Sequence, residues 1–287
     1  MPIKAVVFDM GGVLIPGPVE FWKSLEERKT LDVSTLLSTL TTAPVFEHYQ
    51  SLERGETTAE DFDPLFTHFY NKQHGRTEEV IPLIGTTVKR LHETSLNSDM
   101  VELLKDLRSA GCKTALLTNN FYGDRARLQP TLPKGIEKYF DVIVESCRAG
   151  LRKPDTAIYR HICDKLKVKP EECMLLDDLG QNLKPARVMG FTTIKVTSQP
   201  KAAAEVRNTL RELFEFPSNT RECLPIAKSA MNITVDGRRQ RGRPKTLWLD
   251  RIEEDMRVLK LTEEDALNRR KWRNQTRYAD PSSWEYG

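Results

Sequence analysis

Paired cysteines are missing from this sequence. Its five cysteines lie at positions 112, 147, 163, 173 and 223, and no two of them form a Cys-x-x-Cys pair. The odd number and scattered spacing argue against a zinc site of the zinc-finger type and against a disulfide framework. We therefore predict packed thiols in a reducing compartment.

Long apolar runs are also missing. No run approaches the roughly 18 apolar residues that span a bilayer. The N-terminal apolar run carries Asp9 in its middle and lacks a small-residue cleavage site, so it does not resemble a signal peptide. We predict a cytoplasmic protein that does not bind a membrane.

Excess charge is absent from most of the chain. Residues 236–287 contain 13 Lys or Arg and 10 Asp or Glu, so the whole formal net charge of +3 lies there. The Pro- and Ser-containing stretch at 216–235 resembles a linker. We predict an α/β part at residues 1–16 and 96–215, an inserted α-helical cap at 17–95, and a basic helical tail at 236–287.

The stretch IKAVVFDMGGVLI, residues 3–15, organises the α/β part. Its apolar run from Ile3 to Phe8 is typical of a buried central strand, and it stops at Asp9. Gly11 and Gly12 follow, and they allow a sharp turn and a close approach to a ligand. A carboxylate at the carboxyl end of a parallel strand lies where such sheets bind their ligands.

The stretch from Glu20 to Thr94 has a helical pattern with few strand-like runs. Thr58 indicates a helix start, and Phe62, Leu65, Phe66 and Phe69 recur with the spacing of one buried helix face.

From Ser98 onward, helices and strands alternate. The expected strands are 113–118, 141–145, 173–176 and 192–196, and the expected helices are 98–110, 181–189 and one that opens at Lys153-Pro154 with Pro154 at its first position. This alternation predicts βαβ units and a doubly wound parallel α/β sheet.

Polar side chains follow several of these strands. Asp9, Thr118 with Asn119, Lys153 and the pair Asp177-Asp178 would all face one crevice. Carboxylates with a lysine and a hydroxyl suit Mg²⁺ and a phosphoryl group.

The ordered motifs VVFDMGGV, LLTNN, KPD and LLDDLGQN resemble those of the haloacid dehalogenase (HAD) superfamily. ESCRAGLRKPDTAIYRHICDKL is similar in particular to the HAD domains of soluble epoxide hydrolases and of some acyl-CoA dehydrogenase fusions. The resemblance covers residues 1–215 and implies a Rossmannoid phosphatase with Mg²⁺ as cofactor and a small phosphorylated substrate.

The resemblance also implies roles for individual residues. Asp9 would be the nucleophile and a metal ligand, and Lys153 would neutralise the phosphoryl group that Thr118 and Asn119 bind. Asp178 and the main-chain carbonyl of Gly11 would complete the metal site, with Asp177 and Asn182 supporting it.

One position departs from the family pattern. The usual general acid, two residues after the nucleophile, is replaced by Gly11. We expect metal binding to survive and proton transfer to be lost, which would slow catalysis with poor leaving groups.

The tail supports an alternative of a different class. Arg241-Gly242-Arg243-Pro244-Lys245 matches the core of an AT-hook, and the tail is similar to the end of reverse-transcriptase polyproteins from non-LTR retroelements. The alternative is a non-catalytic HAD-like binding protein that associates with nucleic acid through this tail.

Overall fold

The computed structural model describes residues 2–29 and 31–211. The described residues up to Arg108 and from Cys112 to Thr209 form one compact unit. Its elements in chain order are β1 (Ala5–Phe8), α1 (Pro18–Lys29), α2 (Val33–Leu40), α3 (Val45–Glu53), α4 (Ala59–His74), α5 (Leu83–Leu91), α6 (Ser98–Ser109), β2 (Lys113–Thr118), η1 (Ile136–Tyr139), β3 (Val142–Glu145), α7 (Ser146–Ala149), α8 (Thr156–Leu166), η2 (Pro170–Glu172), β4 (Cys173–Asp177), α9 (Gly180–Val188), β5 (Thr192–Lys195) and α10 (Gln199–Thr209).

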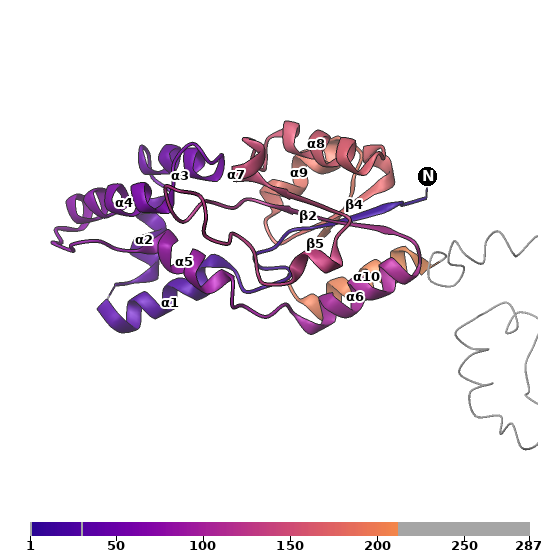
Figure 1. Ribbon diagram of the computed structural model, residues 1–287, viewed down its shortest axis with the longest axis horizontal. Coiled ribbons are helices and arrows are strands. Elements are labelled where there is room, and N and C mark those ends of the chain that lie inside the picture. Colours follow the sequence, from indigo (N-terminus) through magenta and orange to yellow (C-terminus); the bar gives the residue numbers. More distant parts are fainter. Residues whose placement is uncertain (1, 30, 212–287) are drawn as a thin grey trace, which may run out of the picture. The chain divides into compact units, whose positions relative to one another are not determined.

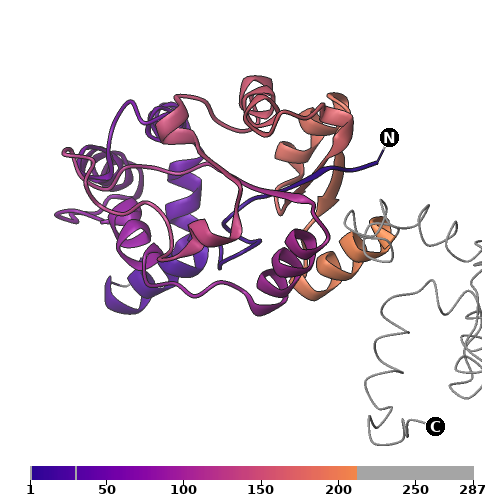
Figure 2. The same ribbon diagram turned by 45° about the vertical axis from the view of Figure 1, so that its right-hand side comes forward.

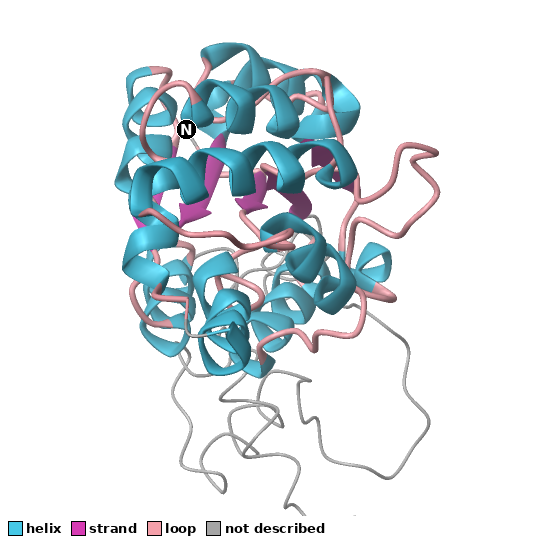
Figure 3. Ribbon diagram, turned by 90° about the vertical axis from the view of Figure 1, so that its left-hand side faces the viewer, coloured by secondary structure: helices cyan, strands magenta, loops and turns pink. Residues whose placement is uncertain are grey.

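The five strands form one parallel sheet in the order β3-β2-β1-β4-β5. Helices α8 and α9 cover one face and α6 and α10 the other (Figure 1; Figure 3 shows the strands between layers of helices). The central strand β1 is completely buried, because apolar helix faces cover both of its sides. The prediction of a doubly wound parallel α/β sheet is confirmed, and each predicted strand is found with ends that differ by at most two residues.

Helices α1 to α5 lie in the chain between β1 and β2, and the strands point their carboxyl ends toward them (Figures 1 and 2). Aromatic side chains pack along α4, where Phe62, Phe66 and Tyr70 stack in series with centroids 6.1 Å apart. The helices belong to the same compact unit as the sheet. The division of the chain into core, cap, linker and tail domains stays a prediction.

The buried face of α4 differs from the predicted one. Thr58 is its N-cap as predicted, and Phe62 and Phe66 are buried, but Leu65 and Phe69 are only half-buried. Polar residues take their place: the carboxylate of Asp63 accepts hydrogen bonds from the main-chain N–H groups of Ile84 and Gly85, both at 2.9 Å. These bonds satisfy free N–H groups at the start of α5.

The helix predicted to open at Lys153-Pro154 begins at Thr156 instead, so the prediction of a first-position proline is wrong. Lys153 is held outside the helix by the side chain of Asn119, which binds both its N–H and its C=O. Asp155 is the N-cap, and the Lys153–Pro154 peptide bond is cis.

Several predictions can be placed against the described part of the chain. Cys112, Cys147, Cys163 and Cys173 are buried free thiols, as predicted, while Cys223 lies outside the described residues. The helical tail, its Arg241–Lys245 motif and the retroelement resemblance also lie outside them. Within residues 2–29 and 31–211, no helix has the length and apolar character needed to cross a membrane.

Candidate active site

Asp9 directly follows the central strand and is buried. The parallel register pairs Phe8 with Leu176, so Asp9 lies beside Asp177 at the carboxyl edge of the sheet. Its Oδ1 accepts a hydrogen bond from the N–H of Met10 at 2.7 Å. The same oxygen forms an ion pair with Lys153 Nζ at 2.8 Å. Both contacts use Oδ1, which leaves Oδ2 as the oxygen that can bind a ligand.

Lys153 connects two of the predicted carboxylates. Its side chain is 1% exposed, and Nζ lies 2.8 Å from Asp9 Oδ1 and 2.6 Å from Asp177 Oδ2. A lysine is almost never buried this completely unless it is paired. The structure therefore brings Lys153 to Asp9 from a loop 144 positions further along the chain.

Asp177, the last residue of β4, has hydrogen bonds to both of its oxygens. Oδ1 accepts from the N–H of Leu179 at 2.9 Å and from Asn182 Nδ2 at 3.0 Å, and Oδ2 accepts from Lys153 Nζ. Asn182 lies on α9, and its main-chain carbonyl accepts a hydrogen bond from the hydroxyl of Tyr159 at 2.7 Å. Asp177 is thus a fully bonded acceptor that orients its neighbours.

Asp178 is half-buried and lies against the glycine turn after Asp9. Oxygens of Asp9, Asp177 and Asp178 all lie within 4.8 Å of one another. Gly12 has φ +73°, and a Cβ atom added there would overlap the carboxylate of Asp178. This close approach and backbone conformation both require glycine.

Thr118 and Asn119 lie at the end of β2, as predicted, and the Thr118 side chain is buried. The Thr118 hydroxyl donates to the carbonyl of Asn119 at 3.2 Å. The side chain of Asn119 makes a reciprocal pair with the main chain of Lys153, at 2.8 and 2.9 Å. The role of Asn119 in phosphoryl binding stays a prediction, and its side chain is already bonded to Lys153 and Glu53.

Gly11 lies in the same turn, two residues after Asp9, and forms an isolated bridge with Ile15. Its backbone has no left-handed conformation, and the nearest atom to an added Cβ is Pro18 Cδ at 3.5 Å. A side chain can therefore be introduced at position 11 without a clash at its Cβ.

Two buried charged residues of this site were not predicted from the sequence. Glu53, the last residue of α3, pairs with Arg152 at 2.6 Å and also accepts from Asn119 Nδ2 at 3.1 Å. Arg152 precedes Lys153 in the KPD motif region, which is a weak signal. Glu53 has no local signal, because its partners are 66 and 99 positions away.

The electrostatics of the site follow from burial of like charges. Burial raises the pKa of the Asp9 carboxyl; Lys153 opposes this effect and Asp177 adds to it. Burial and Asp177 likewise raise the pKa of Asp178. Burial alone would lower the pKa of Lys153, but Asp9 and Asp177 raise it above the ordinary value. Lys153 is therefore held in its charged form by the carboxylates of Asp9 and Asp177, while burial opposes the ionisation of Asp9 and Asp178.

The carboxylate oxygens of this site fit a magnesium ion. One lysine faces the carboxylates of Asp9, Asp177 and Asp178, so ionised side chains leave excess negative charge at the site. Hard oxygen ligands from one or two carboxylates are what Mg²⁺ takes in proteins. Oδ2 of Asp9 and the side chain of Asp178 are the groups that would hold it.

The exchange Gly12→Ala tests this geometry. The added methyl group displaces the Asp178 carboxylate, so we expect Mg²⁺ affinity to fall by about 10- to 100-fold, the range seen when the support of a metal ligand is removed. Titration calorimetry with MgCl₂ measures it. Gly75→Ala is the matched control, since Gly75 has φ +61° and no atom near an added Cβ. Equal affinity in both variants would contradict the assignment of Asp178.

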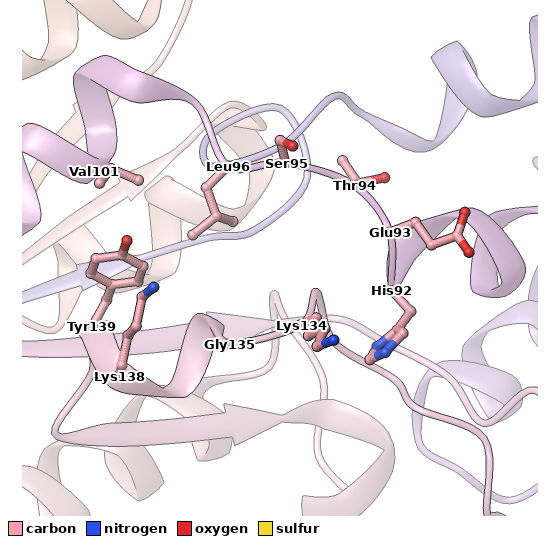
Figure 4. Close-up of a pocket in the computed structure, with 10 residues that line it drawn as sticks. All are labelled: His92, Glu93, Thr94, Ser95, Leu96, Val101, Lys134, Gly135, Lys138 and Tyr139. Atoms are coloured by element: carbon pink, nitrogen blue, oxygen red, sulfur yellow. The ribbon is translucent and has the colours of Figure 1, made fainter.

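A separate cavity of about 490 Å³ lies between the segment after α5 and the loop carrying η1 (Figure 4). Lys138 and Tyr139 line one side, Leu96 and Ser95 the other, and His92 and Lys134 its end. It contains none of the predicted site residues.

The fold and site together define an α/β protein with a buried lysine–carboxylate centre at the carboxyl edge of its sheet. Residues 3–190 match the haloacid dehalogenase-like hydrolase family. The chain belongs to this family, which confirms the resemblance read from its motifs.

Individual relatives agree. The chain is 32% identical to pig bifunctional epoxide hydrolase 2 over 76% of its own length and 41% of that protein. It is 31% identical to mouse acyl-CoA dehydrogenase family member 10 over 75% of its length and 19% of that protein. The chain thus spans less than half of each relative.

Among solved structures, a HAD-like hydrolase from Porphyromonas gingivalis superposes with a TM-score of 0.53 at 22% identity, covering 74% of this chain and 100% of that one. This likeness supports the fold.

Proposed function

We propose that this chain is a magnesium-dependent phosphatase that hydrolyses small phosphoric monoesters through a phospho-aspartyl intermediate on Asp9. The observation that carries the proposal is the position of Lys153 Nζ between Asp9 and Asp177, with Asp178 adjacent. Family membership supports hydrolysis, and a phosphoryl group is the substrate that this charge distribution favours.

Asp9 supplies the nucleophile. Oδ2 attacks phosphorus, a new O–P bond forms, and the bond from phosphorus to the leaving oxygen breaks with its electron pair. Lys153, held by Asp177, would neutralise the phosphoryl oxygens as the attack proceeds, and the Thr118 hydroxyl would donate a hydrogen bond to them. Water then attacks phosphorus, the bond to Oδ2 breaks, and Asp9 is regenerated with release of phosphate.

A bound Mg²⁺ would supply charge neutralisation and orient the phosphoryl oxygens. Asp9 and Asp178 would hold it, with the main-chain carbonyl of Gly11 as the third protein ligand that the family resemblance implies. Asp177 orients Lys153 and Asn182, since both of its oxygens already accept hydrogen bonds.

The first experiment is phosphate release from para-nitrophenyl phosphate with Mg²⁺ and with a chelator. We expect metal-dependent turnover, because the nitrophenolate leaves without a proton. Silence of this chain and of Gly11→Asp alike would reject the phosphatase and favour the non-catalytic binding protein.

Gly11→Asp should increase activity on substrates with poor leaving groups. General acid–base catalysis contributes about 10²- to 10⁴-fold, so we expect a rise of this order with an alkyl phosphate and a smaller rise with an aryl phosphate. The space at position 11 permits the exchange. Gly11→Asn is the control of matched size, and equal rates for the two variants would contradict proton transfer as the missing step.

A further inference from the structure

A buried ion pair joins helix α3 to the loop that carries Lys153. Glu53 and Arg152 are 5% and 8% exposed, and Arg152 Nε lies 2.6 Å from Glu53 Oε2. The proposed reaction does not use either side chain. A buried pair of this kind is weak evidence for stability, because desolvation of two charges offsets much of their attraction. Its geometry therefore calls for another explanation.

The second oxygen of Glu53 fixes the orientation of Asn119. Oε1 of Glu53 accepts from Asn119 Nδ2 at 3.1 Å. A carboxylate only accepts hydrogen bonds, so the amide nitrogen of Asn119 must face Glu53. Asn119 Oδ1 is then directed at the N–H of Lys153, at 2.8 Å, while Nδ2 also reaches the carbonyl of Lys153 at 2.9 Å.

We propose that Glu53 is a positioning residue for Lys153: it acts through Asn119, with Arg152 as its anchor, and makes the geometry of the active site depend on the docking of α3. This inference rests on the proposed function for its kinetic consequence. The chain of contacts runs from Glu53 to Asn119 to the main chain of Lys153, and then through Nζ to Asp9.

The end of α3 is itself packed against segments that follow β2 and β3. Gly55 has φ +71° and lies so close to the carbonyl of Cys147 that a Cβ atom would overlap it. Arg127 donates a hydrogen bond to the carbonyl of Gly55 at 2.8 Å, and Ala59 donates to the carbonyl of Tyr122 at 2.9 Å. These contacts hold Glu53 where it reaches Asn119.

The kinetic test is a cycle of Glu53→Gln and Asn119→Ala with para-nitrophenyl phosphate. Glutamine keeps the size of Glu53 but leaves Arg152 without its carboxylate and no longer dictates the orientation of Asn119. A small misplacement of a catalytic group lowers rates by about 10²-fold, so we expect kcat of Glu53→Gln to fall by that order, with KM changed far less. In the Asn119→Ala background the same exchange should change kcat less than about twofold, because its route to Lys153 is already lost.

Glu56→Gln is the matched control. It breaks an ion pair with Arg54 at 2.6 Å, three positions from Glu53, on a surface where Glu56 is exposed. Its kcat should equal that of the unaltered chain. Additive losses in the Glu53–Asn119 cycle, or a fully active Glu53→Gln variant, would overturn the positioning role.

A crystal structure of Glu53→Gln decides the question without any activity. We expect Lys153 Nζ to move beyond 3.5 Å, the limit of hydrogen bonding, from Asp9 Oδ1. If the unaltered chain does not turn over but Lys153 moves in the variant, the phosphatase proposal fails and the positioning role stands. An unmoved Lys153 overturns the positioning role whatever the kinetics.

Discussion

Asp9→Asn should reduce metal-dependent phosphate release by about 10⁴-fold or more, since removal of a hydrolase nucleophile has effects of that order. The neutral side-chain amide of Asn is a poor nucleophile, and it cannot form the acyl phosphate that the carboxylate of Asp9 would form. The variant should remain folded. Burial raises the pKa of Asp9 to about 7, so replacing its charge with a neutral side chain removes a desolvation cost, and Asn can still accept from Met10.

The measurement combines phosphate release with thermal unfolding in chelator. We expect the melting temperature of Asp9→Asn to equal or exceed that of the unaltered chain, as is common where an active site holds buried like charges. Asp164→Asn, at an exposed position of α8, is the control and should keep full activity. Substantial metal-dependent turnover by Asp9→Asn would assign the nucleophile elsewhere.

Lys153→Met should destabilise the fold as well as stop turnover. Removal of one partner from a buried ion pair typically lowers the free energy of unfolding by about 3–5 kcal/mol, because the remaining charge stays buried and unpaired. Here two carboxylates, of Asp9 and Asp177, lose their counterion. Denaturant unfolding in chelator measures the loss.

The pH and metal dependence of this loss follow from the same cause. A carboxyl whose pKa is raised in the folded state contributes most to stability at low pH, where it is protonated, and that contribution is lost as pH rises through the folded pKa. Lys153→Met should therefore be less destabilising at pH 5 than at pH 8, and Mg²⁺ should restore part of the stability. Lys165→Met, at an exposed site, is the control. Equal stability of Lys153→Met and the control would contradict a stabilising role of Lys153 as the counterion of Asp9 and Asp177.

The parts of the fold that could be predicted from the sequence are those with a local physical signal. Apolar runs of strand length, helices between them and polar residues at the strand ends predicted the sheet and placed Asp9, Lys153 and Asp177 at one edge. Local patterns were less decisive where tertiary contacts compete. The stripe on α4 shifted because Asp63 bonds to the start of α5, and the helix after Lys153 starts late because Asn119 holds that residue.

The sequence by itself determined the family, the polar residues at the ends of the strands, and the replacement of the usual general acid by Gly11. Each of these features is carried by residues that are adjacent in the chain. Only the tertiary structure decided how Lys153 is oriented. Its orientation depends on Glu53, Asn119 and Arg152, which come from α3, the end of β2 and the loop before α8. Hydrogen bonds between positions so far apart in the chain produce no periodic pattern in the sequence, because only folding brings these residues into contact.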